Sequence, residues 1–163
     1  ISIISRGQAG GYTLKVPEKD KHLHTKAEFI DDLAVSMGGM VAEEFKFKEV
    51  TTGARGDLIY ATHLARRLVT HYGMSEKIGP VSLEGEDTNG GYSLFPWEES
   101  RSVYSDATLR LIDEEVAQIL KSAYNKAKEI VAQEQIKLDR IANRLLEKEI
   151  IEKEEFEELM KEA

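Results

Sequence analysis

Apolar residues recur every three or four positions along most of the chain, which is the spacing that places them on one face of an α-helix. The strongest run follows Thr51 and ends before Gly73. Its apolar members are Leu58, Ala61, Leu64, Ala65, Leu68, Val69 and Tyr72. An earlier run follows Thr25, which forms a T-x-x-E capping box with Glu28. We therefore predict that residues 25–80 are mainly helical.

The helical spacing returns at Ser105 and fades between Ala132 and Lys137. Residues 105–163 are therefore predicted to form two paired C-terminal helices and a last short one around Phe156 to Met160. Glycines, a proline and several acids interrupt any period over residues 82–104, which predicts a loop.

The first 17 residues have a different pattern. β-Branched and aromatic residues flank a glycine-bearing turn from Gly7 to Gly11, which predicts a small β-hairpin over residues 1–17. The expected fold is mainly α, with this hairpin at its N-terminal end. A chain of 163 residues has the size of one domain, so we predict a single domain over residues 1–163.

One acidic residue stands out against the helical pattern. Asp57 lies four residues before Ala61 and therefore on the apolar side, about one turn inside a helix that Thr51 or Thr52 could cap. We expect its carboxylate to face the core, where an ionised acid costs several kcal/mol unless a cation or hydrogen-bond donors meet it. Two interpretations remain open. Asp57 is either the helix N-cap itself or a group that binds a metal or pairs with a cation.

Composition narrows the function classes. A net charge of −8 and a pI near 5.1 disfavour nucleic acid or an anionic membrane surface as partners. The chain contains no cysteine, which leaves His, Asp and Glu as metal ligands and is compatible with a reducing compartment. No apolar run approaches the roughly 18 residues of a membrane-spanning helix, and no signal peptide is visible.

The histidines do not complete a metal site in this pattern. His63 and His71 lie eight positions apart, about 12 Å along a helix, so they cannot share an ion. His22 and His24 stand in a polar linker, where we expect exposure. Asp57 is then the residue that the helical pattern singles out as a candidate metal ligand. A catalytic zinc site usually needs three protein groups, so we expect this chain alone to bind zinc weakly or not at all.

The segment TTGARGDL, followed by ATHLARRLV and YGMSEKIGP, closely resembles the peptidase domain of the FtsH family. The resemblance extends to ISIISRGQAGGYTLKVPE, similar to a hairpin of that family, to the GGMVAEE stretch, and to LIDEEV and LLEKEIIEKEEFEEL near the C-terminus. This family consists of membrane-anchored, ATP-dependent zinc metalloproteases of the AAA type. The resemblance implies that Asp57 is a zinc ligand, because it matches the aspartate of the family's TTGAxxDL motif.

The resemblance also implies what this chain lacks. The family's other two zinc ligands and its general-base glutamate lie in an upstream H-E-x-x-H helix, which is absent here, so we assign no catalytic residue within the chain. The chain begins at Ile1 without an initiator Met, and we expect a fragment that is inactive alone. ATP would bind an AAA domain outside it. The parent would be a homo-hexamer anchored in a membrane, with this soluble part on the cytoplasmic, matrix or stromal side, and would degrade protein substrates.

Two further groups of residues are candidates. Glu43 or Glu44 could lie near the metal and orient a ligand histidine, as the resemblance suggests, or both could be an ordinary surface pair. A second group could hold an extended substrate by main-chain hydrogen bonds if its edge is exposed, and otherwise belongs to a purely structural hairpin. Its members are Gly10, Gly11, Tyr12, Thr13 and Leu14.

Two function classes follow. The first is the C-terminal part of a zinc endopeptidase domain. The alternative is a non-catalytic helical oligomerisation module, in which the acidic helices from Ser105 onward make subunit contacts. An H-E-x-x-H motif a few tens of residues upstream of Ile1 would favour the first, and its absence would favour the second.

Overall fold

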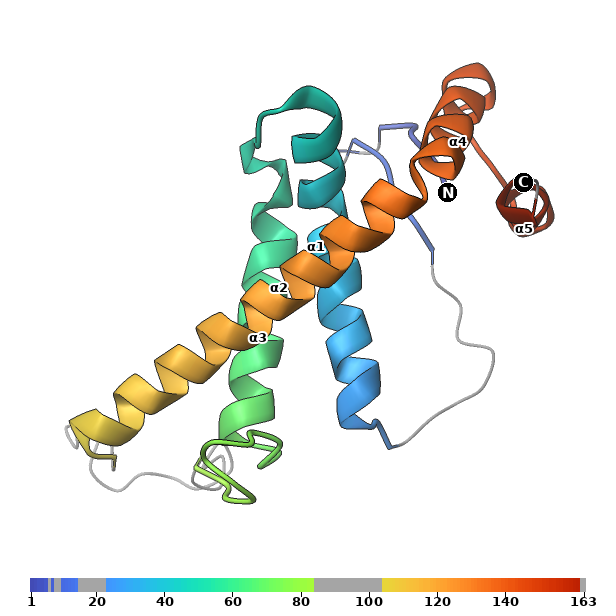
Figure 1. Ribbon diagram of the computed structural model, residues 1–163. Helices are drawn as coiled ribbons and strands as arrows, with labels where there is room; N and C mark the ends of the chain where they lie inside the picture. The colour runs from blue at the N-terminus through green and yellow to red at the C-terminus, as the bar shows by residue number, and fades with distance from the viewer. Residues whose placement is uncertain (6, 8–9, 15–22, 84–103, 162–163) are drawn as a thin grey trace. The chain divides into compact units, whose positions relative to one another are not determined.

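The structure, a computed structural model, describes residues 1–5, 7, 10–14, 23–83 and 104–161. Within them the elements are α1 (Lys26–Phe47), the 3-10 helix η1 (Thr52–Ala54), α2 (Arg55–Thr70), α3 (Asp106–Gln133), α4 (Gln135–Lys148) and α5 (Lys153–Lys161) (Figure 1). The prediction of a mainly helical fold is therefore confirmed. Almost all of the predicted loop over residues 82–104 lies outside the described residues.

The chain divides into two compact units, and the boundary between them falls inside α3. The larger unit is His24–Lys128, and the smaller combines Ile1–Leu23 with Glu129–Ala163. Each unit is described by itself below. The single peptidase domain over residues 1–163 stays a prediction.

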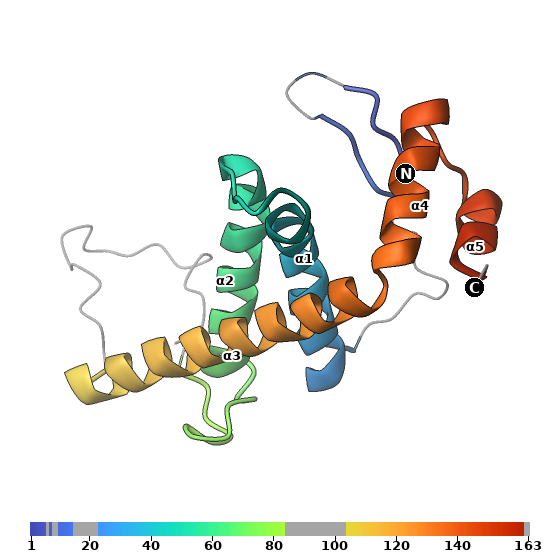
Figure 2. The same cartoon turned by 45° about the horizontal axis from the view of Figure 1, so that its top comes forward.

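The larger unit is built on the first two helices, which lie side by side in both views, with α3 crossing them (Figures 1 and 2). The predicted capping box is confirmed, because Thr25 Oγ1 accepts the Glu28 N–H at 3.3 Å and the Glu28 carboxylate accepts the Thr25 N–H at 2.8 Å. The core uses the apolar faces read from the sequence. Its buried residues on the helices are Leu33, Ala34, Met37, Val41, Ala61, Leu64, Ala65, Leu68, Val69, Ile112, Val116, Ala123 and Ala127.

A buried acid joins α3 to the turn that follows α2. Glu115 is only 7% exposed, and its carboxylate accepts hydrogen bonds from Ser75 Oγ at 2.8 Å and Lys77 Nζ at 2.9 Å. The hydrogen bond from Lys77 holds the pKa of Glu115 below its usual value of 4.5, against the opposing effect of burial. These contacts tie the turn to the helix across 40 positions of sequence.

Glu115→Gln is expected to lower the free energy of unfolding at pH 7 by about 1 to 3 kcal/mol, because it removes a charged partner from a buried hydrogen-bond pair. The lowered pKa means that ionised Glu115 stabilises the fold above about pH 4.5, and that this contribution disappears as pH falls through the folded-state pKa. Urea unfolding at pH 7 and pH 3 measures the difference. The exposed neighbour Glu114→Gln is the control. A deficit in Glu115→Gln that is as large at pH 3 as at pH 7 would count against this role.

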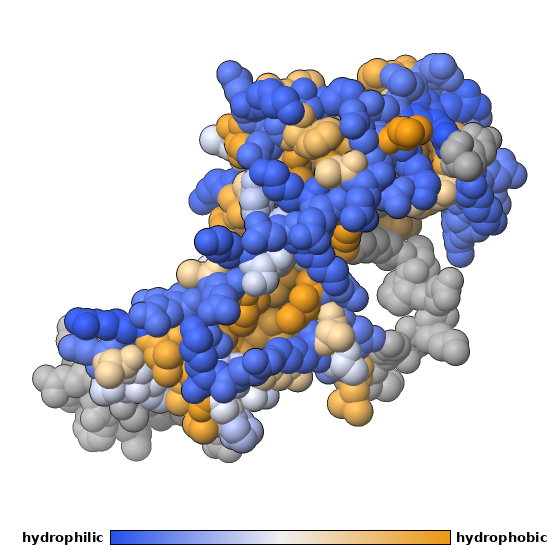
Figure 3. All heavy atoms as spheres, in the orientation of Figure 1, coloured by the Kyte–Doolittle hydropathy of each residue, from blue (hydrophilic) through white to orange (hydrophobic). Residues whose placement is uncertain are grey.

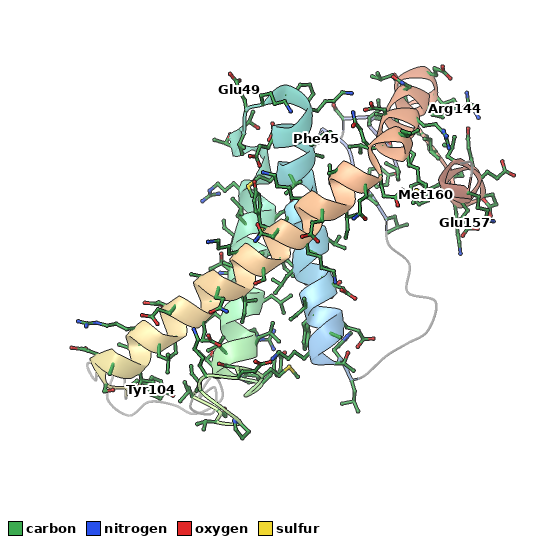
Figure 4. The ribbon with its side chains drawn as sticks, in the orientation of Figure 1. Phe45, Glu49, Tyr104, Arg144, Glu157 and Met160 are labelled. Carbon is green, nitrogen blue, oxygen red and sulfur yellow. The ribbon has the colours of Figure 1, made fainter. Side chains whose placement is uncertain are left out.

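The smaller unit contains the last two helices, which are tied by charged side chains. Arg144 Nε lies 2.7 Å from Glu155 Oε1, and Lys148 Nζ lies 2.9 Å from the same oxygen. Figure 4 labels Arg144 on α4, and Glu157 and Met160 on α5. The helix break at Glu134 falls within the stretch where the apolar period fades, and α5 includes the short helix predicted around Phe156.

The predicted N-terminal β-hairpin is not supported. No strand forms within the described residues; instead Ser2 makes single antiparallel bridges, one to Tyr12 and one to Ile150. A strand requires several consecutive paired residues. Here Gly10 and Gly11 offer no side chains for cross-strand packing, and Leu14 is 74% exposed, so pairing stops after one residue.

Hydrophilic side chains cover much of the face shown in the space-filling view, with apolar side chains gathered between them (Figure 3). None of the described helices combines the length and the apolar character that crossing a membrane requires.

Candidate functional site

The segment that leads into α2 is held by local hydrogen bonds. Thr51 is extended, and its Oγ1 accepts the Gly53 N–H at 3.1 Å, so it caps η1 as an ST-type turn. The N-cap of α2 is Ala54, which carries no capping side chain. Thr51 therefore caps η1, which runs directly into α2, and neither Thr51 nor Thr52 is the N-cap of α2 itself.

The structure corrects the prediction for Asp57. Its side chain is exposed, whereas Ala61, one turn further along the same face, is fully buried. Periodicity placed both on one side correctly, but no described element covers the first turn of α2. Leu58, at 38% exposure, lies in the same uncovered stretch. The prediction that the carboxylate faces a core is therefore wrong for the described residues.

An exposed acid at this position needs no partner to be stable. Asp57 is the third residue of α2, inside the first turn, where the partial positive charge of the helix N-terminus favours an anion by about 0.3 to 1 kcal/mol. It is not the N-cap, since Ala54 occupies that place. The carboxylate oxygens are thus accessible to a group that approaches from outside the described residues.

The two candidate glutamates point to different elements. Glu43 Oε2 accepts the Thr51 N–H at 3.1 Å, which fastens the end of α1 to the segment before Asp57. Glu44 accepts a hydrogen bond from the Tyr124 hydroxyl and lies 3.8 Å from Lys128 Nζ, both on α3. The hydrogen bond to Glu44 raises the pKa of Tyr124. Glu43 therefore belongs to the Asp57 segment, and Glu44 joins α1 to α3.

Glu43→Ala is expected to accelerate amide hydrogen exchange at Thr51 about fivefold, because the amide loses its acceptor, worth about 1 kcal/mol. Glu43→Gln should keep most of the protection, since its amide oxygen can accept the same bond. Exchange measured by NMR or mass spectrometry reads the effect directly. Unchanged exchange at Thr51 in Glu43→Ala would show that the contact does not hold this segment.

The described residues do not make up a metal site by themselves, because no three His, Asp or Glu side chains gather among them. His24 is exposed, as expected, His63 and His71 are exposed as well, and His22 lies outside the described residues. An open hollow of about 420 Å³ lies on α2 and does not include Asp57. Its lining residues are Thr51, Thr52, Arg55, Leu58, Ile59, Thr62 and His63. An accessible carboxylate such as that of Asp57 is chemically suited to bind zinc, and a zinc site that used it would need further ligands from other residues.

The candidate substrate edge lies in the smaller unit. Gly10, Tyr12, Thr13 and Leu14 are exposed, and Gly11 is partly so. Ser2 and Tyr12 exchange two backbone hydrogen bonds, of 2.9 and 2.8 Å. This close approach needs the glycine beside Tyr12, because a Cβ on Gly11 would lie 2.5 Å from the Ser2 carbonyl oxygen.

The hydrogen-bond partners of Glu43 and Glu44 could not be predicted from the sequence. Glu43 and Thr51 are eight positions apart and meet only because the chain reverses after α1. Tyr124 stands 80 positions from Glu44, and nothing in its spacing on α3 distinguishes it from other half-buried residues.

Comparison with known proteins identifies close relatives. The family model described as peptidase family M41 matches residues 1–159. The ATP-dependent zinc metalloprotease FtsH of Chloroflexus aggregans is 46% identical over 99% of this chain, and FtsH 3 of Petrotoga mobilis is 45% identical over 98%. FtsH of Bacillus subtilis is 41% identical over 98%. In each case the chain spans about a quarter of the relative's length.

Proposed function

The chain belongs to peptidase family M41, and from this premise we propose that it forms the C-terminal part of the peptidase domain of an ATP-dependent zinc metalloendopeptidase. The observation that carries the proposal is the match over residues 1–159, which includes the TTGARGDL segment. The accessible carboxylate of Asp57 at the start of α2 is compatible with it. On its own the chain is inactive, because it lacks an H-E-x-x-H motif.

Asp57 is the zinc ligand that this chain contributes, and two histidines and a general-base glutamate come from the upstream helix. Zinc held in such a site lowers the pKa of its water ligand and polarises the scissile carbonyl. Glu43 acts on the same site from a distance. Its hydrogen bond to Thr51 fixes the start of η1, which leads into the first turn of α2, where Asp57 lies. Glu43 therefore positions the ligand Asp57 and does not touch the metal.

Residues 10–14 hold the substrate. An extended polypeptide pairs with the exposed edge through main-chain groups, which gives binding with little dependence on sequence. Protein substrates of many sequences suit such an edge. Because Tyr12 directs its backbone groups toward Ser2, the alternation of an extended chain directs those of Gly11 and Thr13 to the opposite side, where a substrate would add.

The complete protein works as a homo-hexamer. It also has an AAA domain, which binds ATP, and a membrane anchor, and both lie outside this chain. The peptidase part lies on the cytoplasmic, matrix or stromal side of the membrane. Nucleic acid is no partner, in keeping with the net charge of −8.

The proposal is tested on the full-length protein that contains this chain. Degradation of an unstructured protein should require ATP, stop when a chelator removes zinc, and resume when zinc is returned. ATP hydrolysis should persist in the chelated enzyme. A full-length protein that forms rings but cuts no substrate under any metal condition would favour the helical oligomerisation module instead.

A further inference from the structure

The segment Ile1–Ile3 is hydrogen-bonded on both of its sides. On one side Ser2 exchanges two backbone bonds with Tyr12, of 2.9 and 2.8 Å. On the other side Ile3 N–H donates to the Glu149 carbonyl at 3.0 Å, and Ile151 N–H donates to the Ile1 carbonyl at 2.9 Å. The segment therefore lies between the candidate substrate edge and the connection that joins α4 to α5.

The two sets of bonds use alternate residues, as an extended backbone requires. Ser2 serves the side of Tyr12, while Ile1 and Ile3 serve the connection Glu149–Ile151. Ser2 is 3% exposed and Ile151 is 1% exposed, so both inner positions are closed to water. An isolated pair of short extended segments is only marginally stable in water. The connection Glu149–Ile151 therefore stabilises the pairing of Ser2 with Tyr12.

The connection itself is fixed by the helices at its ends. Glu149 closes α4 in a left-handed conformation with φ of 63°, and its N–H donates to the Leu145 carbonyl at 2.7 Å. Glu155 at the start of α5 binds Arg144 and Lys148 of α4. The side chain of Ile151 is among the largest that are fully buried in the described part of the chain.

We propose that the α4–α5 connection positions the substrate-binding edge, with Ile151 as the positioning residue. The inference rests on the proposed function, in which residues 10–14 bind an extended polypeptide. An edge selects and holds a backbone well only when its own backbone is fixed beforehand, because otherwise binding must also order the edge. The connection supplies that order through Ile1–Ile3, so the C-terminal helices control substrate binding without touching substrate.

The test uses Ile151→Ala in the full-length protein, with Leu146→Ala as the matched control, because Leu146 is 74% exposed on the neighbouring helix. In Ile151→Ala the KM for an extended peptide should rise about threefold to tenfold. Peptide kcat and ATP hydrolysis should stay within about twofold, since zinc and nucleotide sites are untouched. Hydrogen exchange across residues 10–14 should accelerate in parallel. Leu146→Ala should leave all four quantities unchanged.

Two comparisons decide the outcome. Gly11→Ala alters the edge directly, so a rise of KM in Gly11→Ala without one in Ile151→Ala would overturn the positioning role alone. Unchanged KM in Gly11→Ala would instead overturn the substrate edge. If Ile151→Ala does not fold, Glu155→Gln is used instead. This substitution weakens the ion pairs between α4 and α5 without changing a buried side chain. Faster exchange over residues 10–14 with a raised KM in that variant supports the inference, and no change in either contradicts it.

Discussion

Asp57→Ala in the full-length protein should reduce peptide cleavage roughly a hundredfold or more, while ATP hydrolysis stays within about twofold. In the proposed function Asp57 is one of the zinc ligands, so the variant would remove a ligand from a metal that would activate water and polarise the scissile carbonyl. In the proposed full-length protein the nucleotide site would lie on another domain and keep its ligands. Cleavage of a short peptide and ATP turnover, measured on the same preparation, separate the two activities.

The stability of the Asp57 variants provides the control. Asp57 is exposed and makes no capping bond, so its loss should cost less than about 1 kcal/mol through the helix dipole alone. Melting temperatures of Asp57→Ala and the parent, both stripped of zinc with a chelator, should therefore be similar. Loss of cleavage together with a large drop in melting temperature would point to a structural role for this carboxylate, contrary to the exposure of Asp57 in the fold.

Gly11→Ala should raise the KM for an extended peptide about threefold to tenfold with little change in kcat. A Cβ at this position would lie 2.5 Å from the Ser2 carbonyl oxygen and 3.1 Å from Ile3 Cα, and both contacts are with backbone that cannot rotate away. The edge must therefore move off Ser2, which weakens the two bonds that Ser2 shares with Tyr12. Loss of one or two such bonds accounts for a change of this size.

The adjacent Gly10→Ala is the matched control, because a Cβ at Gly10 meets nothing within 4 Å. It should raise KM less than Gly11→Ala does, because it does not displace the edge from Ser2. Equal effects of the two substitutions on KM would mean that the loss of glycine flexibility, rather than displacement of the edge from Ser2, limits substrate binding.

The helices were predictable because burial and helical period coincide in them. The buried apolar residues of α2 are members of the run read from the sequence, and the break at Glu134 falls where the helical period fades. A capping box such as Thr25 with Glu28 is equally local, so it can be recognised from four residues. These features depend on neighbours in sequence, which is why they need no tertiary information.

The candidate site was harder to predict. Period fixes the direction in which Asp57 points, but not whether another element covers that side, and in the described residues none does. The N-terminal segment pairs with Ile150, a partner near the opposite end of the chain, which local pattern cannot indicate. A role for Asp57 in zinc binding was suggested by the resemblance to a family. Spacing alone indicates only an acid in the first turn of a helix, where the helix dipole favours a negative charge.

Zinc content of Asp57→Asn in the full-length protein is the most direct measurement of the central claim. Asparagine keeps the size of the side chain and suits the start of a helix, but its neutral amide is a poor zinc ligand. We expect Asp57→Asn, purified and desalted beside the parent, to carry a small fraction of the parent's zinc per subunit and to cleave almost no peptide, while the zinc-free forms of the two proteins melt at the same temperature. A variant with the parent's full zinc content and normal cleavage would contradict the assignment of Asp57 as a ligand.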